Sequence, residues 1–462
     1  MKDHIQDIHF VGVGGVGMCG LAELLHQQGY RVTGSDLKEG PGLTRLRAMG
    51  LEVSVGHDAG QVGHAQVVVV SSAVPKDNVE LKAARSLQIP VIGRAEMLAE
   101  IMRLHDGIAV GGSHGKTTTT SLIAHILDVA NLDPTAIIGG RILGGPERSG
   151  ARLGSGRWLV AEADESDGSF LRLAPVISVV TNIDPEHLDY YGSTEALSDA
   201  FVNFANGIPF WGLAVVCIDH PGVQAILPRL SRRYRSYGFS NQADWVASEV
   251  EATPTGMQFD VHASGQKRGR LTLALPGRHN VLNALAALTV ADELGIDFET
   301  SAEALARFEG VERRFERLGK VGDVLVIDDY AHHPAEIRAT LEAARGLQST
   351  RVLAIFQPHR YTRTRDCLEE FSTAFNDTDR LFVTEIYGAG EKAIEGIDGR
   401  SLCDRIREHG HRDTHFVPTL EDGLDRISKE VEPGDLVLTL GAGDIARFGP
   451  LLLERLHGGT RR

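Results

Sequence analysis

The chain has 462 residues, of which 42% are hydrophobic and 24% charged, and its formal net charge is −15. At about 150 residues per domain, this length predicts about three domains, and the composition excludes disordered and collagen-like chains. The negative charge argues against binding to nucleic acid or to an anionic membrane surface. The sequence contains neither a run of about 18 apolar residues, as a membrane span needs, nor the apolar core of a signal peptide. Its four scattered cysteines have no metal-ligand or disulfide pattern, so we expect reduced thiols and a cytoplasmic protein.

The predicted elements alternate between strands and helices along the whole chain. In the first 105 residues, strands are expected at 8–13, 31–34 and 67–70, and a helix at 16–28. The next part predicts strands at 107–110 and 176–181, helices at 117–129 and from Val281, and short strands and turns over 230–275. A third part begins near Gly310, with strands at 324–327, 351–356, 381–384 and 436–440. Such alternation is typical of parallel sheets with crossover helices, so we expect three α/β units in series.

The first glycine-rich turn follows the first predicted strand. Gly12, Gly14 and Gly17 have the GxGxxG spacing, and Asp36 follows at the end of the second predicted strand. This pattern is typical of a dinucleotide site in which the acid binds a ribose hydroxyl. It fits a nicotinamide or flavin dinucleotide, and it also fits another nucleotide diphosphate such as a UDP-sugar.

A second glycine-rich turn, GGSHGKTTTT, lies between a predicted strand and a predicted helix. Backbone N–H groups of such a turn bind phosphate oxygens, and the helix directs its positive end at the same anion. Lys116 is then expected at the β- and γ-phosphates and Thr117 at Mg²⁺. The match to the general P-loop pattern is partial, because Val110 stands where that pattern has its first glycine. A dehydrogenase does not need an ATP-type loop, so this motif favours a pyrophosphate other than NAD at the first turn.

Two acidic motifs follow predicted strands in the middle of the chain. AEADESD contains Glu162, and TNIDPEH contains His187. Hard oxygen ligands near a P-loop suit Mg²⁺, although a solvated acidic loop has the same composition.

Three motifs rich in arginine and histidine mark the third part. They are GVERRF at 310–315, DDYAHHP at 328–334 and FQPHRYTRTRD at 356–366. They come at or near strand ends, where open α/β sheets bind ligands. Clustered arginines in an acidic chain indicate recognition of carboxylates or phosphates, whereas the plain alternative is a surface salt-bridge patch.

Taken together and in this order, these motifs and LPGRHNVLNALAA at 275–287 resemble those of the Mur ligase family of peptidoglycan synthesis. The resemblance covers essentially the whole chain. It is greatest to the branch that joins L-alanine to UDP-N-acetylmuramate, since VGVGGVGM and GSD also match that branch. The resemblance implies three consecutive α/β domains: a Rossmann-like domain for the UDP-sugar at 1–106, a P-loop ATPase-like domain for ATP and Mg²⁺ at 107–309, and a Rossmann-like domain for the amino acid at 310–462. It also implies an acyl-phosphate mechanism and a monomer or weak homodimer.

The resemblance also implies roles for individual residues. Catalytic roles are expected for Lys116, His187, Arg314 and His332, and metal binding for Thr117, Glu162 and His187. ATP binding is expected for Gly112, Ser113, His114, Gly115, Lys116, Thr117, Thr118, His279, Asn280, Asn283, Arg314 and Asp329. Substrate binding is expected for Gly12, Gly14, Gly15, Gly17, Asp36, Ser71, Ser72, Tyr330, His332, His359, Arg360 and Arg363.

Two positions depart from the family pattern. Ser113 stands where the family usually has threonine, which keeps the hydroxyl. The chain has no lysine between Lys116 and Lys267, so the carbamylated lysine of several Mur ligases has no counterpart in the expected stretch. A carboxylate such as Glu195 or Asp199 is a candidate replacement. The rival hypotheses are another Mur-type ligase with a different amino acid or peptide, a nucleotide-dependent oxidoreductase, and an ATP-driven switch protein.

Overall fold

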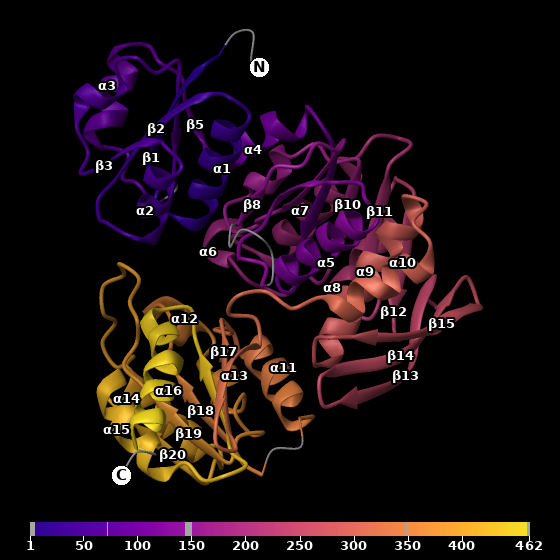
Figure 1. Ribbon diagram of the computed structural model, residues 1–462, viewed down its shortest axis with the longest axis vertical. Helices are drawn as coiled ribbons and strands as arrows, with labels where there is room; N and C mark the ends of the chain where they lie inside the picture. The colour runs from indigo at the N-terminus through magenta and orange to yellow at the C-terminus, as the bar shows by residue number, and fades with distance from the viewer. Residues whose placement is uncertain (1–4, 72, 144–149, 348–349, 460–462) are drawn as a thin grey trace. The chain divides into compact units, whose positions relative to one another are not determined.

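The computed structural model describes residues 5–71, 73–143, 150–347 and 350–459. Three β-sheets follow one another along the chain, and each has helices beside its strands (Figure 1). The expected fold class, three consecutive α/β domains, is therefore confirmed.

The first sheet is parallel throughout, with the strand order β3-β2-β1-β4-β5. Its strands are β1 (Asp7–Val11), β2 (Arg31–Asp36), β3 (Glu52–Val55), β4 (Val67–Val70) and β5 (Val91–Gly93). Its helices are α1 (Val16–Gln27), α2 (Pro41–Ala48), α3 (Val79–Ser86) and α4 (Arg94–Met102), with a 3₁₀ turn, η1 (Ala59–Val62). Strand order reverses at β1, and ligands of open α/β sheets bind beyond the carboxyl ends of strands at such a point.

The second sheet has ten strands in the order β15-β14-β13-β12-β11-β10-β6-β9-β7-β8. They are β6 (Asp106–Gly111), β7 (Thr135–Ile137), β8 (Ala151–Arg152), β9 (Trp158–Glu162), β10 (Ile177–Val180), β11 (Leu213–Cys217), β12 (Tyr234–Gly238), β13 (Trp245–Thr253), β14 (Gly256–Ala263) and β15 (Gln266–Leu273). The helical elements are α5 (Lys116–Val129), η2 (Ser169–Arg172), α6 (Leu188–Tyr191), α7 (Thr194–Asn206), α8 (Pro221–Ile226), η3 (Leu227–Arg229), α9 (Arg278–Glu293) and α10 (Phe298–Arg307). Strand β6 lies between β10 and β9, so the P-loop that follows β6 lies between the loops that follow its two neighbours.

The third sheet has the order β16-β17-β21-β18-β19-β20, with β16 antiparallel to β17. Its strands are β16 (Glu316–Val321), β17 (Val324–Asp329), β18 (Val352–Phe356), β19 (Arg380–Val383), β20 (Thr414–Phe416) and β21 (Leu436–Leu440). Its helical elements are α11 (Pro334–Arg345), α12 (Tyr361–Asp366), α13 (Leu368–Ser372), α14 (Gly399–Glu408), α15 (Leu420–Glu430), η4 (Asp444–Arg447) and α16 (Phe448–Gly459). Two buried apolar clusters involve the residues of these strands.

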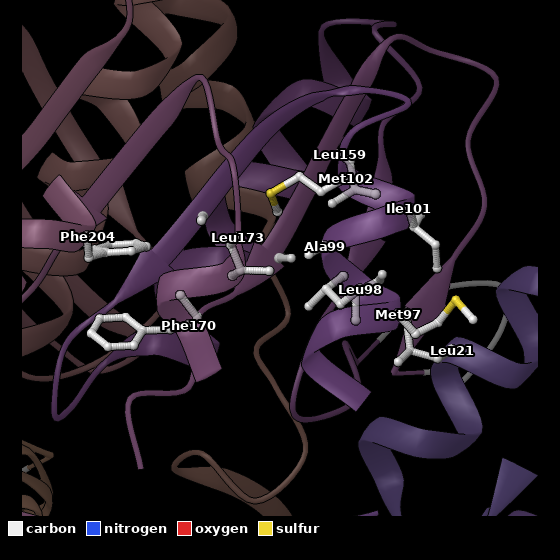
Figure 2. Close-up of a cluster of buried hydrophobic side chains, with 14 of the residues drawn as sticks. Leu21, Met97, Leu98, Ala99, Ile101, Met102, Leu159, Phe170, Leu173 and Phe204 are labelled. Atoms are coloured by element: carbon white, nitrogen blue, oxygen red, sulfur yellow. The ribbon is translucent and has the colours of Figure 1, made fainter. Parts of the chain in front are cut away.

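The chain forms two compact units, and the first contains the first sheet and most of the second, whereas parts of β13, β14 and β15 belong to the second unit. This first unit comprises Met1–Ser248, Asp260–Leu271 and Leu282–Phe308, and the second comprises Glu249–Phe259, Thr272–Val281 and Glu309–Arg462. Within the first unit, α4 packs against α1 on one side and against η2 on the other. Figure 2 shows this shared core, with Leu21 of α1, Met97 and Leu98 of α4, and Phe170 and Leu173 at η2. The two sheets are thus joined by one continuous apolar core.

Several predicted boundaries differ from the observed ones. The helix expected from Val281 begins at Arg278, directly after Gly277, whose positive φ of 97° forms the preceding turn. The first strand ends at Val11 because Gly12 has a φ of 80° and turns the chain. The strands within 230–275 are not all short, since β13 has 9 residues and β14 and β15 have 8 each.

Within the described residues, no helix combines the length and the apolar character needed to cross a membrane.

Candidate active site

The P-loop joins β6 to α5 through two glycines with left-handed backbone conformations. Gly112 has a φ of 131° and Gly115 a φ of 82°. A Cβ atom at Gly112 would clash with the Thr181 hydroxyl, and one at Gly115 would lie 2.7 Å from Oδ1 of Asn283. Both positions therefore require glycine, because of the backbone and because of the space.

Lys116, the first residue of α5, is held in place by four oxygen atoms. Its Nζ lies 2.9 and 2.8 Å from the carboxylate oxygens of Glu165, 2.6 Å from the carbonyl oxygen of Gly112 and 3.1 Å from that of Ser113. Glu165 has only 1% of its surface exposed, and burial raises its pKa to about 7. Burial opposes the charge on Lys116, but the carboxylate of Glu165 more than offsets this effect and raises the lysine pKa. The ammonium is therefore charged and fixed at the N-terminus of α5, where phosphates bind.

Thr117 and Glu162 form the expected pair of oxygen ligands. The Thr117 hydroxyl donates to Oε1 of Glu162 at 2.6 Å, and the Gly139 N–H donates to Oε2 of the same carboxylate. A hydroxyl and a carboxylate beside a P-loop are ligands that suit Mg²⁺. The next residue, Thr118, is buried on the same helix.

His187, for which the resemblance implies metal binding, lies beside two acidic side chains. Its Nε2 is 3.9 Å from Oε1 of Glu165 and 3.7 Å from Oε2 of Glu186. Its backbone is left-handed, with a φ of 56°. His187 and Lys116 thus both contact the buried Glu165.

Ser113 and His114 connect the P-loop to the loop after β10. The Asp184 N–H donates to the Ser113 hydroxyl at 2.9 Å, and the His114 N–H donates to Oδ1 of Asn182 at 2.7 Å. The His114 ring lies 3.2 Å from Asp184, and hydrogen bonds from His114 and His220 hold the Asp184 pKa far below its usual range. In this structure, both side chains stabilise the shape of the loop.

The ATP-binding residues predicted in the LPGRHNVLNALAA motif fall into two groups. Asn283 accepts a hydrogen bond from the Thr119 hydroxyl at 3.1 Å and lies against Gly115, so it belongs to the P-loop site. His279 and Asn280 belong to the second compact unit, where the Asn280 amide donates to the carbonyl of Pro276 at 2.7 Å. Burial lowers the pKa of His279 to about 4.

The first glycine turn is held by the end of β2. The carbonyl of Ser35 accepts hydrogen bonds from the N–H groups of Gly12, at 2.8 Å, and Val13, at 3.0 Å. The Gly14 N–H donates to Oδ2 of Asp36 at 2.8 Å. Asp36 therefore fixes the turn in this structure, and its binding of ribose stays a prediction.

Gly15 and Gly17 lie at the start of α1, where a helix offers N–H groups and positive potential to an anion. Ser71 packs against Gly12, with its Cβ 3.0 Å from the position of a Cβ at Gly12. Ser72 lies outside the described residues.

Arg94 is a candidate site residue that sequence reasoning missed. It is the first residue of α4, and its side chain lies against Gly17. A Cβ atom added at Gly17 would lie 3.3 Å from both Cδ and Nη1 of Arg94. Its Nη2 lies 3.6 Å from Oδ2 of Asp164, in the AEADESD motif. Arg94 thus connects the glycine turn of the first sheet to the acidic loop of the second. No local motif marks it, because its neighbours come from distant parts of the chain.

In the second unit, GVERRF and DDYAHHP form one site. The guanidinium groups of Arg313 and Arg314 lie 5.1 and 5.2 Å from the ring centre of Tyr330. The buried Asp329 accepts hydrogen bonds from the N–H groups of Phe315 and Ala331, both at 2.7 Å. Burial raises the Asp329 pKa to about 6, although Arg314 opposes this.

The FQPHRYTRTRD motif joins the same site. The rings of His332 and Tyr330 are 5.2 Å apart, those of His332 and His359 are 5.9 Å apart, and Nη1 of Arg363 lies 3.2 Å from Nδ1 of His359. Arg360 has a φ of 70° and donates its backbone N–H to Tyr387. Burial lowers the pKa of His332 to about 3, so its imidazole is neutral at pH 7 and is a weak base.

The candidates for replacing the carbamylated lysine lie on α7. Glu195 is exposed in the first turn of that helix, and Asp199 forms a surface ion pair with Arg229 at 2.6 Å. This ion pair does not involve Glu162.

Comparisons with known proteins cover nearly the whole chain. The family models described as Mur ligase family, catalytic domain, as Mur ligase middle domain and as Mur ligase, glutamate ligase domain match residues 7–106, 110–291 and 313–443. The UDP-N-acetylmuramate–L-alanine ligase of Anaeromyxobacter dehalogenans strain 2CP-1 is 54% identical over 97% of this chain and 98% of that protein. The crystal structure of the UDP-N-acetylmuramate–alanine ligase from Thermotoga maritima is similar, with a TM-score of 0.84, 30% identity, and coverage of 98% and 99%. A murein peptide ligase from Psychrobacter arcticus 273-4 has a TM-score of 0.71 and 25% identity, with coverage of 97% and 98%.

Proposed function

The chain belongs to the Mur ligase family, and we propose that it joins L-alanine to the lactyl carboxylate of UDP-N-acetylmuramate at the expense of ATP. The products are ADP, phosphate and UDP-N-acetylmuramoyl-L-alanine, a precursor of peptidoglycan. The observation that carries this proposal is the 54% identity, over nearly the full length of both chains, to relatives bearing that name. A ligase for a peptide is the second candidate, because the murein peptide ligase has the same fold at lower identity.

The reaction needs an activated carboxylate, because a free carboxylate is a poor acyl donor. Transfer of the γ-phosphoryl group from ATP gives an acyl phosphate, which the amine of alanine attacks before phosphate leaves. Lys116 is placed to offset the repulsion between the γ-phosphate and the substrate carboxylate. For this, the phosphates must replace Glu165 as the anionic partner of the Lys116 ammonium.

One group of side chains beside the P-loop fits Mg²⁺. Thr117 and Glu162 supply a hydroxyl and a carboxylate already in contact, and His187 lies on the neighbouring loop. Bound there, the ion would neutralise charge on the transferring phosphoryl group. The hydrogen bond between Thr117 and Glu162 keeps the hydroxyl and the carboxylate together beside the P-loop.

We assign the three domains separate substrates, with boundaries at 1–106, 107–309 and 310–462. The UDP-sugar binds the first domain, with its diphosphate at the N-terminus of α1 near Gly15, Gly17 and Arg94. ATP binds the P-loop of the second domain. In the third domain, Tyr330, His359 and Arg363 bind L-alanine, with Arg363 positioned for the carboxylate.

A catalytic role is expected for His332, and accepting a proton from the attacking amine is the first role to consider. A proton acceptor for the attacking amine needs a pKa near that of the group it serves, and burial lowers that of His332 to about 3. We therefore propose that His332 orients Tyr330 and His359 as a neutral imidazole. Because ATP and a sugar nucleotide are the proposed substrates, we place the enzyme in the cytoplasm. From the resemblance to the family, we propose a monomer or weak homodimer.

The decisive assay is phosphate release from ATP and Mg²⁺ with UDP-N-acetylmuramate, tested with L-alanine, L-serine, glycine and a tripeptide. Release that requires both UDP-N-acetylmuramate and L-alanine supports the proposal. Release only with the tripeptide would make the chain a peptide ligase, and release without the sugar nucleotide would make it an ATPase.

A further inference from the structure

The first domain contains a buried polar cluster that has no part in the chemistry described so far. Glu80, in the first turn of α3, is fully buried. Its Oε2 accepts a hydrogen bond from the Ser35 hydroxyl at 2.6 Å and lies 3.2 Å from Nδ1 of His57 and 3.8 Å from Nε2 of His9. Its Oε1 accepts a hydrogen bond from the Asp58 N–H at 3.2 Å.

The groups that Glu80 binds are the ones that shape the sugar-nucleotide site. Ser35 uses its carbonyl to hold the N–H groups of Gly12 and Val13, and the next residue holds that of Gly14. The turn that carries His57 and Asp58 is tied to the same strand end, because the Gly56 N–H donates to the carbonyl of Asp36 at 2.7 Å. One carboxylate thus links the end of β2, the turn after β3 and, through Ser35, the glycine turn after β1.

Attachment of α3 does not account for this carboxylate. Leu81 and Ala84 already pack the helix against Val11, Val62 and Val68 in an apolar cluster. A buried charge costs free energy unless hydrogen bonds compensate for it, and replacing one with an apolar group often stabilises a protein. Burial raises the pKa of Glu80, but the neighbouring His9 and the hydrogen bond from Ser35 more than offset this, so the group is charged. The partners of its carboxylate lie in β1, at the end of β2 and in the turn after β3, and none of them belongs to α3.

We propose that Glu80 is a positioning residue for the sugar nucleotide, which fixes Ser35 and the 56–58 turn so that the glycine turn offers its remaining N–H groups to the diphosphate. This inference rests on the proposed function, because it takes UDP-N-acetylmuramate as the ligand of the first domain.

The test measures binding of UDP-N-acetylmuramate by calorimetry together with the steady-state constants of the full-length enzyme. Glu80→Gln keeps the size of the side chain but places an NH₂ group against donors. We expect the dissociation constant and the KM for the sugar nucleotide to rise about tenfold, the effect of roughly one lost hydrogen bond. The KM for ATP and kcat at saturating sugar nucleotide should stay unchanged. Ser35→Ala should weaken binding of the sugar nucleotide in the same way. The double variant should bind it no more weakly than the single variant with the larger effect, since both substitutions remove the same linkage.

Glu23→Gln is the matched control, because Glu23 is a buried carboxylate of the same domain, paired with Arg45 at 2.8 Å. It should lose thermal stability without the selective rise in the sugar-nucleotide constants. Unchanged binding in Glu80→Gln and Ser35→Ala would overturn the inference, as would equal weakening in Glu23→Gln at the same loss of Tm. If Glu80→Gln does not fold, Ser35→Ala decides alone. Failure of the wild-type enzyme to bind UDP-N-acetylmuramate would instead overturn the proposed function, and this inference with it.

Discussion

The ammonium of Lys116 and the carboxylate of Glu165 form a bidentate ion pair, with Nζ 2.9 and 2.8 Å from the two carboxylate oxygens. The pair lies under the P-loop, and Glu165 is almost completely buried. A bound phosphate would offer the lysine a second anionic partner, so the pair connects the stability of the empty enzyme to nucleotide binding.

Glu165→Gln should therefore destabilise the empty enzyme by about 3 kcal/mol, because it leaves a largely buried ammonium without its counter-charge. ATP should restore much of this loss, since its phosphates supply the missing charge, and the rise in Tm on adding ATP should exceed that of the wild type. Thermal unfolding with and without ATP measures both effects. Asp435→Asn removes a buried carboxylate paired with Arg351 at 2.7 Å in the other unit, and ATP should not rescue it preferentially. Equal rescue of the two variants would contradict the prediction.

Lys116→Ala should abolish acyl-phosphate formation while leaving the binding of UDP-N-acetylmuramate largely intact. The lysine lies at the P-loop, whereas the proposed diphosphate site is at the start of α1. Single-turnover transfer of labelled γ-phosphate and calorimetric binding of the sugar nucleotide separate the two steps. Loss of sugar-nucleotide binding with ATP turnover preserved would reverse the assignment.

Arg94→Ala should weaken UDP-N-acetylmuramate binding about tenfold or more, because a charge-assisted contact with the diphosphate is lost. Arg172→Ala is the control: Arg172 also joins the first two sheets, through Glu96 at 2.6 Å, but it is exposed and has no contact with the glycine turn among the described residues. Binding measured at low and high salt should show a smaller salt dependence for Arg94→Ala. A similar loss in both variants would mean that Arg94 acts only by joining the two sheets.

Arg363→Ala should mainly raise the KM for L-alanine, by about tenfold or more, because Arg363 is the proposed partner of its carboxylate. Arg365→Ala, on the same helix but paired with its neighbour Asp366 at 2.7 Å on the surface, should leave that constant unchanged. Initial rates over a range of alanine concentrations decide between them. An unchanged KM for alanine together with weaker ATP binding would exchange the roles of the second and third domains.

The histidines of the second unit should make the enzyme sensitive to acid. Burial lowers the pKa of His332 to about 3 and that of His279 to about 4, from an ordinary value of 6.5. Below pH 6.5 the unfolded chain therefore binds more protons than the folded chain. The contribution of these neutral histidines to the free energy of unfolding is fully present above pH 6.5 and is lost as pH falls towards 4 and 3. Urea unfolding at pH 7.5 and 4.5 should show a smaller loss for His332→Asn than for the wild type. The same loss in both proteins would mean that His332 is protonated in the folded protein at pH 4.5.

The sequence predicted the three α/β units and placed both glycine turns correctly after strands, because periodicity and turn residues are local signals. It also brought Thr117 and Glu162 to one site, since each follows or ends a strand of a parallel sheet. The partners of individual side chains were less predictable. Asp36 fits a ribose-binding pattern, yet it accepts the Gly14 N–H, and His187 lies beside Glu165 and Glu186.

Arg94 and Glu80 show why such residues escape a reading of motifs. Arg94 stands at the start of a helix with no neighbouring glycine or acid pattern, and its contacts with Gly17 and Asp164 exist only after two sheets are joined. Glu80 resembles an ordinary acid in the first turn of a helix, where it would normally face solvent. Its burial depends on β1, β2 and the turn after β3, whose arrangement a single sequence does not reveal.

The apolar core shared by the first two sheets has a consequence for how the chain can be divided. A fragment ending at residue 106 would lose the packing of η2 against α4 and so expose part of the apolar surface of this helix, whose Met97, Leu98, Ile101 and Met102 are all buried in the intact chain (Figure 2). Such a surface favours aggregation over an independently stable module. The first two sheets, the proposed sugar-nucleotide and ATP regions, are therefore expected to melt in one cooperative transition, and a protease should cut between them slowly.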